Sequence, residues 1–416
     1  MKTVIVGSGP AGVYSAIMLA RNSKVTLIDE SEKLGGTCIL YGCMPSKAML
    51  HATHIIYSAR SLGKELNFTQ DEIIKLAKDT VNRLSKGVEY TLSSYDVEVI
   101  HGKAELSDGT IKVGNQSIDS NGIIVATGTV KPQVENTIAS DDIPYLSQKI
   151  SSAVIIGGGA GGVEYGDLLS EWGVDLSIVE RGPTLLPNSD PDLSNAVTTT
   201  FKKKGVKLYL NKNVKKIEKG IVILDDETKI TGDVVIFSFG RKPNVAGFEA
   251  LSRGGPIKVD KTMYTGMGKI YAAGDVTGTY TAHEAIHEGI VASLNLLGIE
   301  KEFVSDFVPK VIYAKPEIAT IGRMSGNSVK VNYAELGRAI AEKNTSGFLK
   351  LFYDGGRING AVIYGEHAED IANLISLIIS QNLSMQAVFD NVFAHPSYME
   401  ILWEALGRAL GYFRGK

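Results

Sequence analysis

Residues 3–12 read TVIVGSGPAG, and residues 153–162 read AVIIGGGAGG. In each stretch an apolar run typical of a buried strand passes through the pattern Gly-x-Gly-x-x-Gly into a segment with helical character. The copies are in register, so that Gly7 of the first corresponds to Gly157 of the second. Glycines in this pattern permit a tight turn, let backbone N–H groups approach a pyrophosphate and allow close helix packing. The repeat predicts an α/β chain with two Rossmann-like dinucleotide-binding units.

Each copy is followed by a second apolar run that ends in acidic residues. The first run, KVTLIDE, ends at Asp29 and Glu30, and the second, VDLSIVE, ends at Glu180. An acid at about this distance from the glycines hydrogen-bonds the ribose hydroxyls of a bound dinucleotide. A carboxylate at Glu180 would repel the 2′-phosphate of NADP, which favours NAD at the second copy. Arg181 weakens this preference, because a guanidinium beside the acid could accommodate the phosphate.

The only two cysteines, Cys38 and Cys43, lie within the sequence GGTCILYGCMPSK, residues 35–47. Thiols this close can open and close as a disulfide while the fold is unchanged, and exchange proceeds by thiolate attack through a mixed disulfide. If Pro45 begins a helix at its first position, Cys43 and Lys47 share one helical face and can address the same bound partner. A single cysteine pair excludes a secreted disulfide framework and leaves a zinc site incomplete, so no metal is expected.

The composition gives no sign of a nucleic-acid or membrane partner. With 43 basic and 46 acidic side chains among 416 residues, the formal net charge is −3, and basic residues form no long run. Met1 and Lys2 lead directly into an apolar strand, which argues against a signal or transit peptide. No apolar stretch approaches the roughly twenty residues that span a bilayer. We expect a cytoplasmic protein of several domains that binds neither nucleic acid nor membrane.

Residues 35–47 closely resemble the redox-active signature of the class I pyridine nucleotide-disulfide oxidoreductases, the family of dihydrolipoamide dehydrogenase, glutathione reductase and mercuric reductase. The resemblance extends along the whole chain. Residues 240–244 (GRKPN) and 270–275 (IYAAGD) are similar to the passages by which the family leaves the NAD domain and returns to the flavin. Residues 394–400 (AHPSYME) resemble the family's His-Pro-Thr-x-x-Glu pattern. Residues 281–289 (TAHEAIHEG) look most like the dihydrolipoamide dehydrogenases.

The resemblance implies an FAD domain split between residues 1–147 and 242–305, with an NAD domain of residues 148–241 inserted into it. Residues 306–416 would form a C-terminal α+β dimerisation domain, in which strands are followed by helices. The predicted fold class is therefore α/β, with two Rossmann-like domains and this third domain. The cofactors implied are FAD at the first glycine motif and NAD at the second.

The resemblance also assigns roles to the cysteine loop. Cys38 would exchange with the sulfur of the substrate, and Cys43 would lie against the flavin. Lys47 would lie near the flavin N5 and form an ion pair with Glu164, which follows the second glycine motif. The charge of Lys47 would stabilise negative charge that develops on the reduced ring.

A histidine near the C-terminus completes the site implied by the resemblance. His395 would act as the general base, oriented by a hydrogen bond with Glu400, and Pro396 would begin the following helix. In the family this histidine reaches the disulfide of the other subunit. The chain is therefore expected to form a homodimer whose active sites are shared between subunits.

The cofactor-binding residues implied by the resemblance lie in the glycine motifs, the acids, the cysteine loop and the returning strand. They are Gly7, Gly9, Pro10, Ala11, Gly12, Asp29, Glu30, Gly36, Thr37, Lys47, Ala104, Thr127, Gly128, Gly157, Gly159, Gly162, Glu180, Gly240, Gly274, Asp275 and Ala282.

The function implied is oxidation of a dihydrolipoyl dithiol with NAD, through a Cys38–Cys43 disulfide and FAD. The partners would then be lipoyl domains of a 2-oxoacid dehydrogenase complex. Two alternatives stay open: an NAD(P)H-dependent reductase of another small disulfide, such as a coenzyme A disulfide, and a diaphorase or quinone reductase in which the disulfide is idle. Departures from the family pattern bear on the substrate more than on the chemistry; they are Leu40, Tyr41, Ala160, Gly161 and Phe393.

Overall fold

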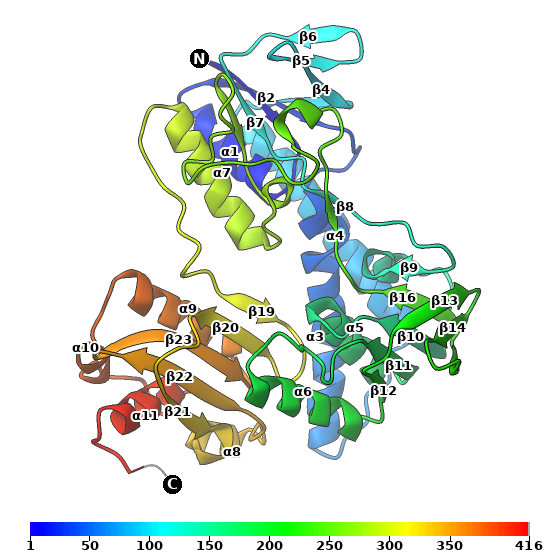
Figure 1. The fold of residues 1–416 in the computed structure, drawn as a ribbon, viewed down its shortest axis with the longest axis vertical. Helices are drawn as coiled ribbons and strands as arrows, with labels where there is room; N and C mark the ends of the chain where they lie inside the picture. The colour runs from blue at the N-terminus through cyan, green and yellow to red at the C-terminus, as the bar shows by residue number, and fades with distance from the viewer. Residues whose placement is uncertain (415–416) are drawn as a thin grey trace.

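The computed structural model of the chain describes residues 1–414, so Gly415 and Lys416, the end of the predicted dimerisation domain, lie outside the described residues. Figure 1 shows three regions. The N-terminal region, blue and cyan, lies at the top together with the yellow-green helix α7 (Ala282–Leu296). The green region lies at the right, and the orange and red C-terminal region at the lower left.

The N-terminal region is built on a parallel five-stranded sheet with the order β18-β7-β1-β2-β3. Its central strand β1 is almost entirely buried and feeds through the first glycine motif into α1 (Pro10–Ala20). The edge strand β18 comes from far along the chain, after the second glycine motif, so the second unit is inserted into the first. The strands are β1 (Lys2–Val6), β2 (Lys24–Asp29), β3 (Glu98–His101), β7 (Gly122–Val125) and β18 (Ile270–Ala272).

Two small antiparallel sheets complete this region. One is a three-stranded meander of β4 (Ala104–Ser107), β5 (Thr110–Val113) and β6 (Gln116–Ile118). The other pairs β8 (Thr129–Val130) with β17 (Lys242–Pro243), and these strands are the two chain passages between the first and second units.

The inserted unit repeats the same architecture. Its parallel sheet has the order β12-β11-β10-β16-β9, and β10 feeds through the second glycine motif into α5 (Ala160–Glu171). A three-stranded antiparallel sheet of β13 (Val214–Glu218), β14 (Ile221–Leu224) and β15 (Lys229–Thr231) is attached to it. The remaining elements are β9 (Ile138–Ala139), β10 (Ser152–Ile156), β11 (Asp175–Glu180), α6 (Pro191–Lys203), β12 (Lys207–Leu210) and β16 (Val234–Phe237).

The acids at the ends of β2 and β11, Asp29 and Glu180, form equivalent hydrogen bonds in the two units. Asp29 accepts the backbone N–H groups of Ser8, at 2.6 Å, and Ser31, at 2.8 Å. Glu180 accepts those of Gly158 and Gly182, both at 2.7 Å. In each unit one carboxylate therefore joins the glycine turn to the end of the second strand, because N–H donors on both oxygens stabilise a carboxylate that is withdrawn from water.

Three helices follow the first unit's second strand and connect the regions. They are α2 (Gly36–Leu40), α3 (Cys43–Ser61) and α4 (Gln70–Ser94). The start of α4 is fixed by a capping box. The Thr69 N–H donates to the Glu72 carboxylate, and the Glu72 N–H donates to the Thr69 hydroxyl oxygen. Figure 1 shows α3 and α4 running from the N-terminal region down beside the inserted unit.

The C-terminal region is an α+β unit with an antiparallel sheet in the order β19-β20-β23-β22-β21. Helices α9 and α11 cover this sheet with buried apolar faces. The elements are β19 (Lys310–Ile312), β20 (Ile318–Gly322), β21 (Asn327–Asn332), α8 (Gly337–Ala341), β22 (Phe348–Asp354), β23 (Arg357–Tyr364), α9 (Ala368–Ser380), α10 (Met385–Phe389) and α11 (Glu400–Ala409).

One sequence-based expectation in this region is wrong. Pro396 does not begin a helix, because α11 begins four residues later, at Glu400. The preceding segment is an irregular loop held by Glu400 itself, whose Oε2 accepts the backbone N–H of Ser397 at 2.7 Å.

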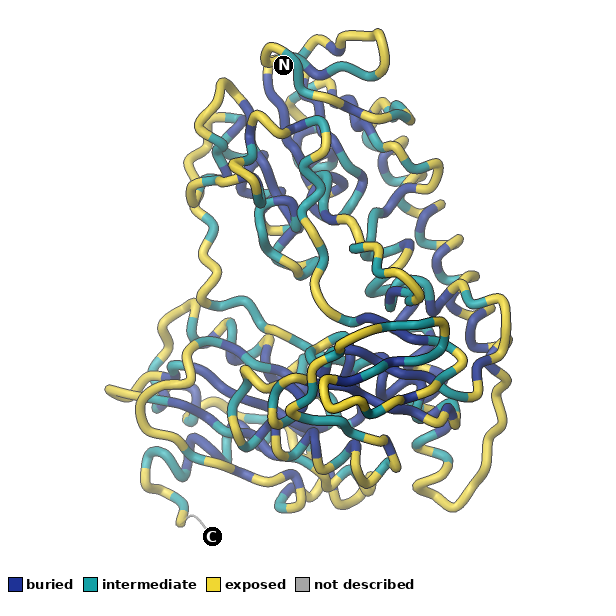
Figure 2. Tube along the Cα trace, turned by 45° about the vertical axis from the view of Figure 1, so that its right-hand side comes forward, coloured by how far each residue is buried: buried dark blue, intermediate teal, exposed yellow. Residues whose placement is uncertain are grey.

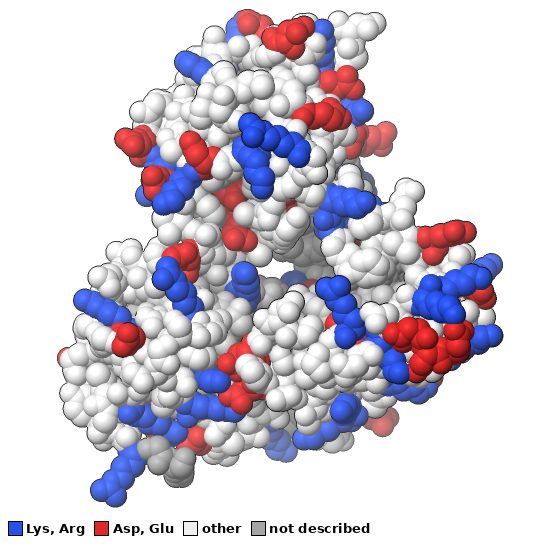
Figure 3. Space-filling view, in the orientation of Figure 1, with Lys and Arg blue, Asp and Glu red and all other residues white. Residues whose placement is uncertain are grey.

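One apolar cluster joins α3 and α4, the inserted unit and one face of the C-terminal sheet, while the N-terminal sheet has its own core. Met49 of α3, Val163 of α5 and Phe348 of β22 are buried in a single apolar cluster, and Figure 2 shows dark-blue buried segments running through each region. Figure 3 shows basic and acidic side chains interspersed over the face of the molecule that it presents. Within residues 1–414, none of the helices combines the length and apolar character needed to cross a membrane.

Candidate active site

The two cysteines lie at a junction of short helices. Cys38 is on α2, Cys43 is the first residue of α3, and both are partly exposed free thiols. The turn between them is held by the Gly42 N–H, which donates to the Thr37 carbonyl at 2.7 Å. The helix α3 begins at Cys43 and not at Pro45 as expected. Pro45 is tolerated there because the first four N–H groups of a helix have no partner within the helix.

The two thiols differ in acidity. A hydrogen bond from Cys38 and, against the opposing effect of burial, the charge of the Lys47 ammonium together lower the pKa of Cys43 to about 7. The same hydrogen bond, together with burial, raises the pKa of Cys38. When both cysteines are reduced, Cys43 is therefore the thiolate near neutral pH and Cys38 keeps its proton.

The ion pair expected between Lys47 and Glu164 is formed. Lys47 Nζ lies 2.6 Å from Glu164 Oε1, and the two side chains are 30% and 14% exposed. Lys47 also stands one turn after Cys43 on α3, so the pair and the thiol share a face. Tyr313, which the sequence did not single out, contacts both partners: its N–H donates to Glu164 Oε2 at 3.2 Å, and its ring centroid lies 4.2 Å from Lys47 Nζ.

His395 and Glu400 form the second expected pair. His395 Nδ1 lies 2.7 Å from Glu400 Oε1, while the histidine side chain is 78% exposed. Although burial acts in the opposite direction, the hydrogen bonds with His395 and Ser397 lower the pKa of Glu400. Among residues 1–414 no hydrogen bond or ion pair joins His395 to either cysteine, so within one chain these two parts are not brought together.

The first glycine motif fits the pyrophosphate of a dinucleotide. Gly7 has φ of +106°, and a Cβ there would lie 2.2 Å from the Ala126 carbonyl oxygen, so the turn requires glycine. A Cβ at Gly9 would meet no atom within 4 Å, so the space before the N-terminus of α1 is open. In the described chain no side chain caps that end of α1, which leaves its N–H groups for an anion.

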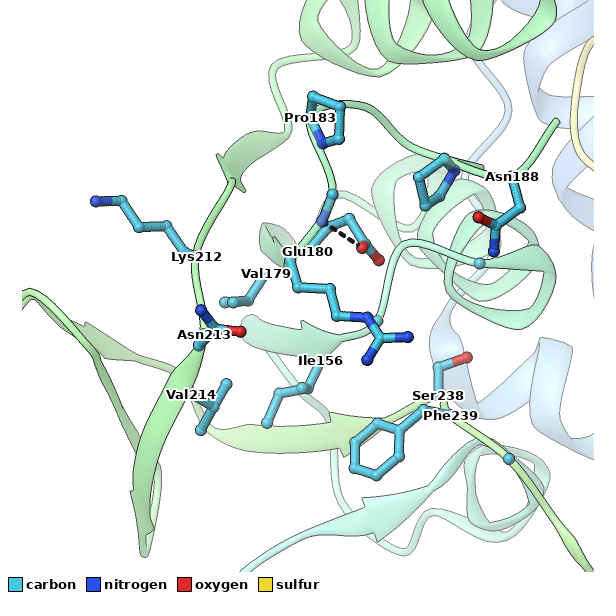
Figure 4. A pocket seen from close by; sticks show the side chains of 16 residues that line it. Ile156, Val179, Glu180, Pro183, Asn188, Lys212, Asn213, Val214, Ser238 and Phe239 are labelled. Carbon is cyan, nitrogen blue, oxygen red and sulfur yellow. Dashed lines mark hydrogen bonds between the residues drawn. The ribbon is translucent and has the colours of Figure 1, made fainter. Parts of the chain in front are cut away.

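The second glycine motif also fits the pyrophosphate of a dinucleotide. Gly157 has φ of +107°, the space at Gly159 is open, and the start of α5 likewise has no side-chain cap in the described part of the chain. A cavity of about 870 Å³ lies over this motif. Figure 4 shows Glu180 near the middle of the pocket, Val179 to its left, and Ser238 and Phe239 at the lower right. Gly240 and Arg181 also line this cavity.

The structure gathers the other predicted cofactor residues around the first motif, apart from Gly162, which belongs to the second. Gly7, Asp29, Glu30, Ala104 and Thr127 line one cavity of about 170 Å³. Gly36 packs on Gly9, and Gly274 on Ala11. The remaining positions belong to the same ends of strands and helices: Pro10 and Gly12 in α1, Thr37 in α2, Gly128 before β8, Gly162 in α5, Asp275 after β18 and Ala282 at the start of α7.

Two further residues of this site were missed at the sequence level. The buried Glu288 accepts the Gly274 N–H at 2.7 Å and so holds the loop that presents Asp275, and burial raises the pKa of Glu288 to about 7. The Arg241 guanidinium donates to Thr129 Oγ1 at 2.7 Å and to Thr37 Oγ1 at 3.3 Å. Glu288 lies inside the sequence TAHEAIHEG and Arg241 inside GRKPN. Only the three-dimensional structure shows that they bind the Gly274 N–H and the Thr129 and Thr37 hydroxyl oxygens.

We predict that Glu180 discriminates between the two nicotinamide dinucleotides. Replacing it by Gln removes the charge while one side-chain oxygen still accepts a backbone N–H. Because the repulsion of a 2′-phosphate is lost, the ratio of kcat/KM for NADPH to that for NADH should rise about tenfold. Arg181→Ala is the matched change in the same cavity and should lower this ratio. An unchanged ratio in the Gln variant would contradict the prediction.

Comparison with known proteins agrees with this geometry. The family profile described as pyridine nucleotide-disulphide oxidoreductase matches residues 1–289, and that of the family's dimerisation domain matches residues 308–406. The chain is 30% identical to a dihydrolipoyl dehydrogenase of Bacillus subtilis, over 98% of this chain and 96% of the relative. It is 31% identical to a dihydrolipoyl dehydrogenase of Geobacillus stearothermophilus, over 99% and 96%.

Solved structures show the same fold. LpdA from Mycobacterium tuberculosis is similar with a TM-score of 0.91 and 23% identity, over 98% of this chain and 100% of that chain. The flavoprotein disulfide reductase RclA from Escherichia coli, solved as a Cu(II) complex, is similar with a TM-score of 0.88 and 26% identity, over 98% and 99%.

The repeated dinucleotide fold, the paired cysteines and these matches lead to one assignment. The chain belongs to the pyridine nucleotide-disulphide oxidoreductase family, whose members are flavoprotein enzymes that use FAD and NAD.

Proposed function

We propose that this protein is a dihydrolipoyl dehydrogenase, which oxidises a dihydrolipoyl dithiol to the disulfide with NAD. The observation that carries the proposal is the arrangement of Cys38, Cys43, Lys47 and Glu164, in which an acidic thiol, a second thiol and an ion pair share one site. The relatives named dihydrolipoyl dehydrogenase, aligned over nearly the whole chain, support the choice of substrate.

The two cysteines would act in sequence from the disulfide form. A substrate thiolate attacks Cys38 Sγ, the Cys38–Cys43 bond breaks, and Cys43 leaves as a thiolate. The second substrate thiol then attacks the substrate sulfur of the mixed disulfide, which releases Cys38 and the oxidised substrate. The lowered pKa of Cys43 suits it to the role of leaving group, since a more acidic thiol leaves faster.

His395 would move the protons of this exchange. Its Nδ1 is engaged by Glu400, which leaves Nε2 free to take a proton from the attacking thiol and to return one to Cys38. Because His395 is highly exposed on its own chain, we propose that it serves the cysteine pair of a partner subunit in a homodimer. The dimerisation domain at residues 308–406 supports this arrangement.

The cofactors would complete the reaction. The first glycine motif would hold FAD and the second would hold NAD, and the two cofactors would supply the two-electron and hydride-transfer chemistry that the side chains lack. The residues that would hold them are those named above at the two glycine motifs, and Lys47 would place its positive charge at the reacting face.

We also propose a domain division, the partners and the cellular location of the protein. The proposed domains are residues 1–147 and 242–305 for FAD, 148–241 for NAD and 306–416 for the dimer contact, although β9 (Ile138–Ala139), within the first range, pairs in the sheet of the inserted unit. The partners are lipoyl domains of a 2-oxoacid dehydrogenase complex. The protein acts in the cytoplasm, where a lone pair of cysteines is kept for redox chemistry and not for structure.

The test is an anaerobic visible spectrum of the FAD-loaded protein during titration with dihydrolipoamide. We expect a long-wavelength absorption band from the Cys43 thiolate beside the oxidised flavin. Because the pKa of Cys43 is lowered to about 7, the thiolate and hence the band should grow as the pH rises through about 7. If dihydrolipoamide gives no band while NADH bleaches the flavin, the disulfide is not coupled and the diaphorase alternative is preferred.

A second candidate is a reductase of a different small disulfide. It is favoured by an aromatic pair at the cysteine loop, where the Tyr41 and Tyr145 rings lie 6.0 Å apart and both side chains are partly exposed. The similarity to the disulfide reductase RclA supports it as well. In this case NADH should produce the band, and a disulfide other than lipoamide should reoxidise the enzyme fastest.

A further inference from the structure

All three regions of the chain meet at the ion pair beside Cys43. Lys47 comes from α3, Glu164 from α5 of the inserted unit, and Tyr313 from the residue directly after β19 of the C-terminal region. Lys47 Nζ lies 2.6 Å from Glu164 Oε1 and 4.2 Å from the centroid of the Tyr313 ring. The Tyr313 N–H donates to Glu164 Oε2 at 3.2 Å. Tyr313 therefore contacts the cation through its ring and the anion through its backbone.

The ion pair needs such support because a lysine side chain is long and flexible. Lys47 is 30% exposed, and a partly exposed pair of this kind gains little from its Coulomb attraction alone once side-chain entropy is counted. An aromatic face within about 6 Å attracts an ammonium and restricts where it can lie. The backbone donor to the second oxygen of Glu164 also fixes the orientation of the carboxylate.

We propose that Tyr313 is a positioning residue that holds Lys47 and Glu164 in place beside the Cys43 thiol. This inference rests on the proposed function and extends it to the C-terminal region, which would contribute to the redox site of its own subunit in addition to forming the dimer contact. Burial raises the pKa of Tyr313 to about 12, so its phenol stays neutral beside Lys47. It would act through its ring face and its backbone N–H, not through its hydroxyl.

The chemical consequence falls on Cys43. The charged and titratable groups that act on it are Cys38 on α2, Lys47 on its own helix and Glu164 on α5. Lys47 lowers the pKa of Cys43 and Glu164 raises it, with Lys47 the stronger of the two. If Lys47 is free to move away, the thiolate loses the cation that lowers its pKa, and the pKa of Cys43 should rise.

The experiment compares four variants with the wild-type, FAD-loaded protein. Tyr313→Leu and Tyr313→Met remove the ring and keep the backbone, while Tyr313→Phe keeps the ring. Tyr57→Leu is the matched control, because the Tyr57 ring centroid lies 5.6 and 6.0 Å from Nζ of Lys204 and Lys315, which form ion pairs with Asp167 and Glu366. Two quantities are measured against pH on the reduced protein: the long-wavelength band, and the rate of Cys43 alkylation by iodoacetamide, followed by peptide mass spectrometry.

We expect the Leu and Met variants to shift both midpoints upward by about half a pH unit, in line with the strength of one such contact. The Phe and Tyr57→Leu variants should match the wild type. The proposal is overturned if both ring-deleted variants titrate like the wild type, or if Tyr57→Leu shifts the midpoints as much. Retained FAD content and melting temperature identify which ring-deleted variant is folded. Failure of the Tyr313 proposal can be distinguished from failure of the proposed function. If the disulfide mechanism itself is wrong, the Cys43→Ser variant keeps its thiol turnover.

Discussion

Replacing Cys43 with Ser should lower dihydrolipoamide turnover by about three orders of magnitude or more, while reduction of a dye by NADH persists. A serine cannot form the disulfide with Cys38, so electrons from the substrate have no route to the flavin. Dye reduction needs only the two dinucleotide sites, whose cavities are lined by residues other than the cysteines. The measurement is steady-state kinetics of both reactions on one preparation with matched FAD content.

The dye reaction of the same variant is the internal control, since its survival shows that the fold and the cofactor sites are intact. Cys38→Ser should lose thiol turnover as well, because the exchanging sulfur is gone. Thiol turnover at wild-type rate in the Cys43→Ser protein would contradict the disulfide mechanism and leave the diaphorase alternative.

Replacing His395 with Ala should lower thiol turnover by about 10²- to 10⁴-fold, which is the range for loss of a general base. The matched control is His367→Ala. His367 is also an exposed histidine of the C-terminal region, with its Nδ1 3.1 Å from Asp370 Oδ2, and its loss should leave turnover unchanged. The pH profile of kcat/KM checks the assignment, because the limb due to the base should disappear only in the His395 variant.

Mixing the two inactive proteins tests whether the active site is shared between subunits. In a heterodimer of Cys43→Ser and His395→Ala chains, one site has both defects and the other has neither. Random exchange in an equal mixture makes half of the dimers heterodimers, so about a quarter of the wild-type turnover should return. If mass spectrometry shows exchange and no activity returns, each site is built within one chain.

The redox loop and the dinucleotide units could be predicted from the sequence because their signals are local. The two glycine motifs and the acids at Asp29 and Glu180 require fixed residue types at fixed spacings, and the structure forms equivalent hydrogen bonds at both acids. Cys43 and Lys47 are one helical turn apart, so their common face followed from the periodicity of the helix. The start of α11 was not predictable in this way, because Pro396 is compatible with a helix start but its position in an irregular loop depends on contacts with Glu400.

The sequence by itself determined the class of fold, the dinucleotide sites and the redox pair, since backbone turns and helix periodicity are set by neighbours along the chain. Tertiary structure alone decided which distant groups support them. Tyr313 meets Lys47 and Glu164 across 266 and 149 positions of chain respectively, and Arg241 meets Thr37 across 204. No local pattern encodes such contacts, because they arise only when segments that are distant along the chain pack against one another and bring their side chains within reach.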